Sequence, residues 1–366
     1  MKFLFLSVFL VVSLISRCQI FENYVDTNNP KITAAVSFYK QYLSGFKGYQ
    51  TPDYSQYWCE NDSKRYQTPD PIVYSISSEY PTYSFGTQKT IFYAKVHPEF
   101  VHLKTLMAHS DSLNNITVYA ITNHYIVDNG KSLHFIRPIN ANSDQYKTVQ
   151  NGNITYHFSK EHNFNKAKSD SLLRVIKKFE SDWNFDPKKL DYYFTDTQDE
   201  LGFLRGLDYY YGMEQNTPSG MAFPEDALIY CNGYGENNFH EILHLYLNPL
   251  YVKSPVNHGL IYYLGGGLGE SFDALINKMN LYLETYPNTN LSEFETLRTK
   301  DITLHINHTV AGLLCKIIDN KEGQKGLQRL LEYDNMTTLF QKEFGLEKHQ
   351  WNEFLKAKFK RYQSAK

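Results

Sequence analysis

Asn238-Phe239-His240-Glu241-Ile242-Leu243-His244-Leu245-Tyr246-Leu247 is the most informative segment of this 366-residue sequence. Its apolar residues recur at helical spacing, which predicts a helix running through a protein interior. On that helix His240 and His244 lie four residues apart on one face, where both imidazoles can bind one metal ion. Glu241 lies beside them, where it can take a proton from metal-bound water and later pass it to a leaving group.

A plainer interpretation of the two histidines also exists. The chain contains 13 histidines, so a His-Glu-x-x-His match can arise by chance. Two histidines on a buried helix can also be ordinary hydrogen-bonded core residues. The sequence that follows the helix favours the metal site over this alternative.

A carboxylate follows at a suitable place. Glu270, within Gly269-Glu270-Ser271-Phe272, opens a second helical pattern. Zinc hydrolases commonly bind their metal through two histidines and one carboxylate, and leave the fourth position to water. The predicted Zn²⁺ ligands are therefore His240, His244 and Glu270, with Glu241 as the general base.

These residues resemble those of the gluzincin peptidases, the peptidase MA-like group that includes thermolysin and the M1 aminopeptidases. That group has His-Glu-x-x-His on one helix and a glutamate on the next, often within Asn-Glu-Gly or Glu-Gly-x-Ala. Around Glu270 the Asn and the following Gly are absent. The metzincin pattern is excluded, because Leu247 and Leu250 stand where its Gly and third His are required. The resemblance covers roughly residues 152–345 and implies one zinc ion and a peptide or protein substrate.

The resemblance implies further roles for three residues. Asp273 is a candidate acceptor for the second N–H of a ligand histidine, although the matching position in thermolysin-like enzymes is one residue later. His258, expected in the loop between the two site helices, and His308 are candidates for stabilising the transition state. Each of the two histidines also has a structural interpretation, as a capping, core or surface residue.

A strand before the active-site helix has a possible role in binding substrate. In the resembling families an edge strand at this place pairs with the main chain of an extended peptide. The candidate here contains Gly220, Met221 and Ala222, and Gly220 would allow a backbone to approach closely. The alternative is an ordinary sheet strand.

The predicted fold class is α+β with two modules. Residues 20–150 are expected to form a helix followed by an antiparallel sheet, and residues 151–366 a zincin-like domain with a mixed sheet, the active-site helix and a helical C-terminal part. In the first module a helix is predicted over Ile32–Leu43 and strands over Pro71–Ile76, Thr90–Val96, Ile116–Thr122 and Ser132–Ile136. In the second, helices are predicted over Ala167–Trp183 and Asp199–Leu204, strands over Asn153–Phe158, Leu190–Thr195 and Asp226–Tyr230, and a loop over Asn248–Asn257 in which Pro249 and Pro255 end the active-site helix.

The N-terminal residues 1–19 are predicted to be a signal peptide, with Lys2 before a short apolar core from Phe3 to Ile15. Arg17 before Cys18 argues against a lipid anchor, so a secreted or periplasmic product is expected. No later segment is apolar enough to predict a membrane helix. The 37 basic and 39 acidic residues nearly balance without a basic tract, which argues against a nucleic-acid partner.

Three cysteines would remain after signal removal, Cys59, Cys231 and Cys315, and they are expected to be free. The function that the sequence predicts is zinc-dependent hydrolysis of peptide bonds. Two alternatives stay open. One is a binding protein on a degenerate peptidase scaffold, and the other is an esterase or amidase that uses the same site.

Overall fold

The computed structural model describes residues 20–213, 218–299 and 304–363. The expected signal segment, with Cys18, lies outside these ranges. The described chain is α+β, as predicted, and its strands form two sheets. The chain divides into two compact units, of which the first contains residues up to Lys64, Thr68–Ala141 and Arg205–Gly212, and the second contains the rest.

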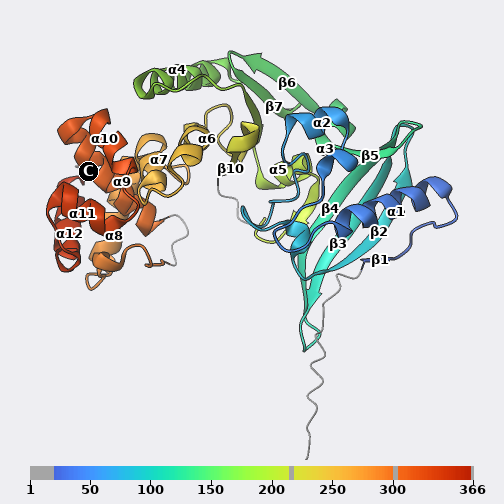
Figure 1. Cartoon of the computed structure of the whole chain (residues 1–366), viewed down its shortest axis with the longest axis horizontal. Helices are drawn as coiled ribbons and strands as arrows, with labels where there is room; N and C mark the ends of the chain where they lie inside the picture. Colours follow the sequence, from blue (N-terminus) through green and yellow to red (C-terminus); the bar gives the residue numbers. More distant parts are fainter. Residues whose placement is uncertain (1–19, 214–217, 300–303, 364–366) are drawn as a thin grey trace, which may run out of the picture. The chain divides into compact units, whose positions relative to one another are not determined.

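In the first unit one long helix packs on a sheet (Figure 1). Helix α1 (Pro30–Ser44) begins after Asn29, whose side chain accepts the backbone N–H groups of Lys31 and Ile32. The helix contacts β2 and β3 through its buried residues. The prediction of a helix over Ile32–Leu43 is confirmed.

The sheet of the first unit has the strand order β1-β2-β3-β4-β5, and β9 also pairs with β4. β1 is parallel to β2, and the other pairs are antiparallel. The strands are β1 (Ile20–Glu22), β2 (Gln88–Val96), β3 (Val101–Ser110), β4 (Ile116–Asp128), β5 (Leu133–Ile136) and β9 (Leu207–Tyr210). This part of the chain also contains two short α-helices, α2 (Glu60–Arg65) and α3 (Pro138–Ala141).

Two features of the first unit differ from the prediction. The predicted strand Pro71–Ile76 is a series of turns, because the Asp70 side chain accepts the backbone N–H of Ile72 at 2.9 Å and folds the chain locally. Ile72 is nevertheless buried, which explains its apolar character. Strand β3 was not predicted, although its buried residues alternate with more exposed ones along most of its length.

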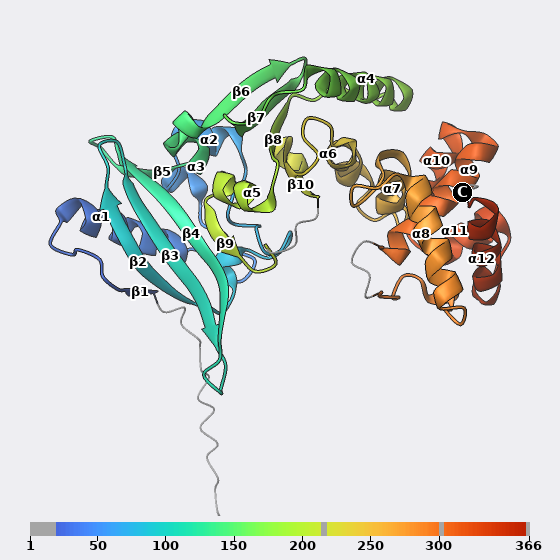
Figure 2. The same cartoon turned by 180° about the vertical axis from the view of Figure 1, so that it is seen from behind.

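The second unit contains a mixed sheet with the order β10-β11-β8-β7-β6. The inner strands β11, β8 and β7 are parallel, whereas each outer strand is antiparallel to its neighbour. Figure 2 shows helix α4 (Lys166–Trp183) beside this sheet. The strands are β6 (Tyr146–Asn151), β7 (Ile154–Ser159), β8 (Leu190–Thr195), β10 (Ser219–Phe223) and β11 (Leu228–Asn232), and a short helix α5 (Gln198–Arg205) follows β8.

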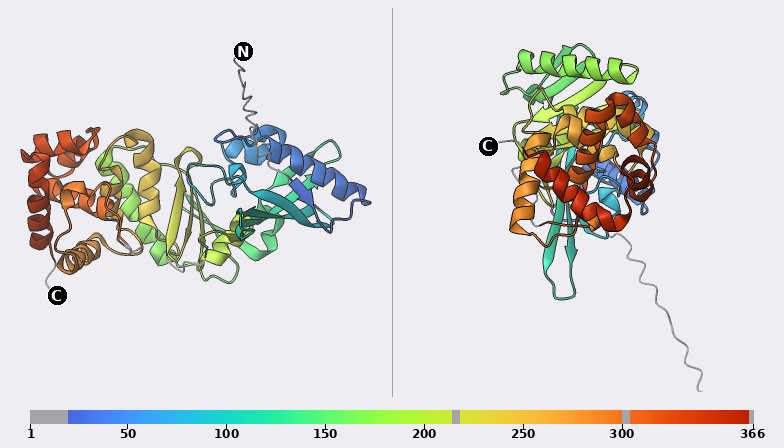
Figure 3. Two further views of the ribbon diagram at one scale, coloured as in Figure 1. Left: turned by 90° about the horizontal axis from the view of Figure 1, so that it is seen from below. Right: turned by 90° about the vertical axis from the view of Figure 1, so that its left-hand side faces the viewer.

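After the sheet the second unit is helical, and its later helices form one cluster, drawn in orange and red in Figure 3. A single hydrophobic core runs from the sheet through α4 into these helices. The helices are α6 (Phe239–Tyr251), α7 (Asn257–Gly265), α8 (Phe272–Thr285), α9 (Ile306–Glu322), α10 (Gln324–Leu331), α11 (Met336–Phe344) and α12 (Trp351–Arg361).

Three predictions between α6 and α8 need correction. α6 continues through Pro249 to Tyr251, so this proline does not end the helix. Residues Asn257–Gly265, expected in part as loop, form helix α7, and His258 therefore lies on a helix. Glu270 precedes α8, whose N-cap is Ser271.

The remaining global predictions concern membranes and cysteines. None of the helices in the described ranges is long and apolar enough to cross a membrane. Cys59, Cys231 and Cys315 are free thiols, and the last two are buried.

Candidate metal and catalytic site

Helix α6 carries the His-Glu-x-x-His motif and is held in place at its start and along its length. The Asn238 side chain accepts the backbone N–H of Glu241 at 3.2 Å and so caps the first turn. Ile242, Leu243 and Leu245 are fully buried in the core. The apolar faces therefore fix the helix, and the two histidines remain on its more open face.

His240 and His244 meet at their Nε2 atoms, which lie 3.2 Å apart. Two nitrogens bound to one tetrahedral zinc at about 2.1 Å would stand roughly 3.4 Å apart. The separation in the structure is therefore close to that of a shared metal ion. Burial lowers the pKa of His240 to about 4 and that of His244 to about 3, so both rings are neutral near pH 7, the form that binds metals.

The other ring nitrogens of this pair fix the tautomers. His240 Nδ1 lies 2.6 Å from the carbonyl oxygen of Gly266, which can only accept, so Nδ1 carries the proton. His244 Nδ1 lies 3.3 Å from Asn248 Oδ1, and that oxygen also accepts from Asn257 Nδ2 at 3.0 Å. Both Nε2 atoms are therefore unprotonated, and their lone pairs repel each other unless a cation lies between them.

Glu241 is buried against the edge strand β10. A Cβ atom at Gly220 would lie 2.5 Å from Glu241 Oε1, so only glycine leaves room for this carboxyl group. Burial raises the pKa of Glu241 to about 8. Gly220, Met221 and Ala222 lie on β10, which is an outer strand of its sheet, in agreement with the predicted edge strand.

Helices α7 and α9 bring further rings to the histidine pair. The rings of His240, His244, His258, His308 and Tyr262 follow one another in a closed circle, with centroid separations between 5.0 and 5.3 Å. We call this set the five-ring cluster. His258 and Tyr262 are four residues apart on α7, the same spacing as His240 and His244 on α6. Three helices thus converge on one site.

The structure does not bring Glu270 to the histidine pair. Its carboxylate forms an ion pair with Lys278 at 2.8 Å. The backbone around Glu270 forms a tight turn, in which the N–H groups of Gly267 and Glu270 each donate to the carbonyl oxygen of the other residue. In the described ranges no group of three His, Cys, Asp or Glu side chains is arranged to hold a metal ion.

Asp273 does not accept a hydrogen bond from either histidine of the pair in the hydrogen bonds that the described residues form. It is largely exposed and pairs with Lys316 at 2.5 Å. The acceptors that do orient the histidines are the Gly266 carbonyl and the Asn248 side chain.

Tyr262 and Asn248 were not predicted at this site, and His258 was predicted only as a candidate for stabilising the transition state. One signal for His258 was present: Asn257-His258-Gly259 has the Asn and the Gly of the Asn-Glu-Gly pattern, with His in place of Glu. Tyr262 lies one helical turn after His258, and its hydroxyl is 2.7 Å from His305 Nδ1. Asn248, four residues after His244, had the spacing of a helical neighbour.

In comparisons with known proteins, no family model, no curated protein and no solved structure matches the chain.

Proposed function

We propose that the chain is a zinc-dependent metallopeptidase, as its sequence predicts, with Glu241 as general base. The observation that carries this proposal is the 3.2 Å approach of two unprotonated Nε2 atoms, on His240 and His244. An ordinary core pair would place a proton between the nitrogens, whereas here both protons are engaged on the far sides of the rings.

We propose His258, rather than Glu270, as the third ligand. The ring of His258 lies 5.2 Å from that of His244, and its side chain is exposed, so it can rotate without displacing core residues. Glu270 would first have to leave Lys278. A three-histidine set is an established arrangement for catalytic zinc.

A zinc ion held there would polarise the scissile carbonyl and lower the pKa of a bound water. The positive charge of the ion would lower the raised pKa of Glu241 and favour its ionised form. That carboxylate would take the water proton and deliver it to the leaving nitrogen. Its burial against Gly220 keeps bulk water away from this proton. We propose Tyr262 and His308 as hydrogen-bond donors to a developing oxyanion, because both rings belong to the five-ring cluster beside the metal ligands.

The edge strand supports a peptide as the substrate. β10 pairs with β11 on one side, and in the described sheet its other side has no strand. An extended peptide can add to such an edge through main-chain hydrogen bonds. Because Gly220 on β10 touches Glu241, a peptide bound there would lie next to the base.

Metal content tests the ligand set directly. We expect close to one zinc per chain in the purified protein by elemental analysis, retained in Glu270→Ala and lost in His258→Ala. A Glu241→Gln variant should keep its zinc and lose hydrolysis of a mixed peptide library. Absence of zinc after reconstitution, or equal hydrolysis by wild type and Glu241→Gln, would overturn the proposal.

One observation favours the alternative of a binding protein on a degenerate scaffold: three metal ligands do not converge among the residues that the structure describes. That alternative predicts peptide binding without cleavage in both wild type and Glu241→Gln. Cleavage by the wild type alone would exclude it. An esterase or amidase would differ only in the substrates that Glu241→Gln ceases to hydrolyse.

A further inference from the structure

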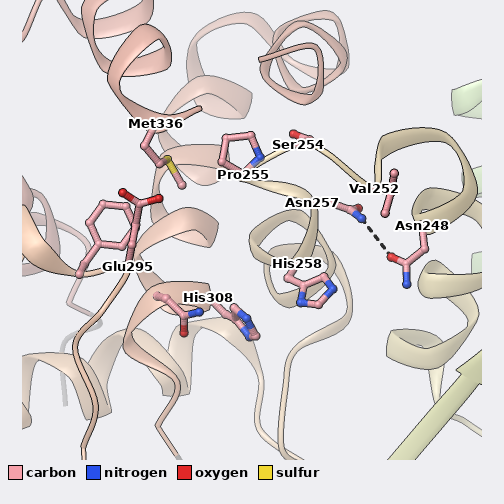
Figure 4. Close-up of a pocket in the computed structure, with 11 residues that line it drawn as sticks. Asn248, Val252, Ser254, Pro255, Asn257, His258, Glu295, His308 and Met336 are labelled. Carbon is pink, nitrogen blue, oxygen red and sulfur yellow. Dashed lines mark hydrogen bonds between the residues drawn. The ribbon is translucent and has the colours of Figure 1, made fainter. Parts of the chain in front are cut away.

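A pocket of about 390 Å³ adjoins the five-ring cluster, and most of its lining residues have no role in the chemistry above. His258 and His308 form part of its wall and belong to both (Figure 4). In that view Glu295 and Met336 lie at one side of the pocket, and Asn248 and Val252 at the other. A group bound in the pocket would therefore be next to the site where the peptide bond is proposed to be cleaved.

Three of the residues that line the pocket have a buried side-chain polar atom without a hydrogen-bond partner: Asn257 Oδ1, Ser254 Oγ and His308 Nδ1. Asn257 is only 4% exposed, and its Nδ2 already donates to Asn248. Its Oδ1 can only accept a hydrogen bond, and Asn257 is one of the residues that line the pocket. Buried polar atoms in native proteins normally have partners, so these three indicate a polar ligand or ordered water.

The charge on the pocket wall is negative. Glu295 is the acidic residue among the described residues that line it, and these residues include no Lys or Arg. Together with Asn257 Oδ1 it offers acceptors, and Ser254 can act as either donor or acceptor. Acceptors combined with a carboxylate match a ligand group that is cationic and rich in N–H donors.

The rest of the wall suits the stem of a long side chain. Phe294, Met336 and Pro255 supply apolar surface between the polar groups. Lys and Arg side chains bury their methylene stems on such surface while the charged end reaches polar partners.

We propose that this pocket binds a cationic side chain of the substrate, the guanidinium of an arginine or the ammonium of a lysine, with Glu295 as the charged partner and Asn257 Oδ1 as the buried acceptor. The assignment of this pocket to substrate specificity rests on the proposed peptidase function. Glu295 is then a specificity-determining residue, because it contacts the substrate side chain and takes no part in proton transfer.

Binding of small probes tests the pocket without requiring hydrolysis. The probes are Nα-acetyl-argininamide, its neutral isostere Nα-acetyl-citrullinamide, and the corresponding lysine and norleucine amides, titrated calorimetrically into the full chain. We expect the arginine probe to bind about 5- to 10-fold more tightly than the citrulline probe, and the lysine probe more tightly than the norleucine probe. Comparing arginine with lysine shows which cation is preferred.

Glu295→Gln should remove most of this preference. The matched control is Glu293→Gln, because Glu293 is an exposed glutamate of the same segment that pairs with Lys348 and does not line the pocket. Equal binding of charged and neutral probes by the wild type, or equal effects of the two glutamine variants, would overturn the inference.

The two proposals fail separately. Glu241-dependent hydrolysis of peptides without a Glu295-dependent preference for arginine or lysine would refute the pocket alone. Glu295-dependent binding of the cationic probes without any hydrolysis would refute the peptidase and leave a cation-binding pocket.

Discussion

Gly220 and Glu241 are in contact across β10 and α6, and a Cβ atom at Gly220 would lie 2.5 Å from Oε1 and 2.6 Å from Cδ of the glutamate. The edge strand and the side chain of the proposed general base are therefore in direct contact at residue 220. Any side chain on residue 220 must displace the carboxyl group rather than the backbone of the helix.

Gly220→Ala should consequently impair catalysis more than stability. The atoms in conflict belong to the end of a flexible side chain, so we expect the free energy of unfolding to fall by less than about 1 kcal/mol. Displacement of the base should lower kcat by about 10- to 100-fold. Thermal unfolding, zinc content and peptide hydrolysis check these effects together, and loss of zinc in this variant would contradict the assigned role of residue 220.

Asn248→Ala should weaken metal binding through His244. The variant removes the acceptor that holds Nδ1–H of His244, and such partners typically contribute 10- to 100-fold in metal affinity. Asn248→Asp keeps an acceptor at the same place and should restore the affinity. Competition with a chromophoric chelator measures both constants, and equal affinities for the two variants would show that the contact does not orient the ring.

Gly259→Ala should destabilise the second unit by separating α7 from α9. An added Cβ would lie 2.3 Å from Ala311 Cβ and 2.5 Å from its backbone carbon, so a helix has to move. Overpacking of this kind costs about 1–3 kcal/mol. Chemical denaturation measures the loss. Gly86→Ala is the control, because nothing lies within 4 Å of its added Cβ, and an equally stable Gly259→Ala would contradict the close packing.

His124 should make the stability of the first unit pH-dependent. It is buried beside Tyr39 and Tyr83, and burial, with a smaller contribution from His102, lowers its pKa from 6.5 to about 3. As the pH falls below 6.5, His124 becomes protonated in the unfolded chain but stays neutral in the folded chain. The free energy of unfolding is therefore highest above pH 6.5 and decreases as the pH falls towards 3. Between pH 7 and pH 5 the loss amounts to about 2 kcal/mol.

A His124→Phe variant isolates this effect. Both proteins contain Asp70, whose pKa is raised by burial, and its hydrogen bond from Tyr83, so we expect Asp70 and the more distant groups to contribute alike to both pH profiles. The unfolding free energy of the wild type minus that of the variant should therefore fall with pH over this window. A constant difference between pH 7 and pH 5 would contradict the proposed protonation state.

Regular amphipathic segments of this fold could be predicted from sequence, because their burial is local and periodic. The helices around Ile32–Leu43 and Ala167–Trp183 are present within a residue or two of the expected bounds. Helix α7 gave no such signal, because it is apolar around most of its circumference and contains glycine where it packs on α9. The segment Pro71–Ile76 has strand composition, but the hydrogen bond from Ile72 to Asp70 makes it a turn.

The candidate site was predictable only where its geometry is local. His240, Glu241 and His244 belong to one helix, so their spacing in the sequence determines which of their side chains share a face of that helix. The position of Glu270 depended on a tight turn and on Lys278, neither of which the spacing reveals. The pairing of His258 with His308 depends on how α7 packs against α9, a contact between residues far apart in the sequence.

Strand β9 (Leu207–Tyr210) pairs with β4 of the first unit, although residues before and after it belong to the second. During synthesis the ribosome must therefore release most of the second unit's sheet before the first unit can be completed. A fragment cut at the predicted boundary between the two modules, near residue 150, would deprive Leu207 of its buried place on β4 and expose that edge. The first unit thus needs a strand from the middle of the chain, and expression of residues 20–150 alone should yield aggregated protein.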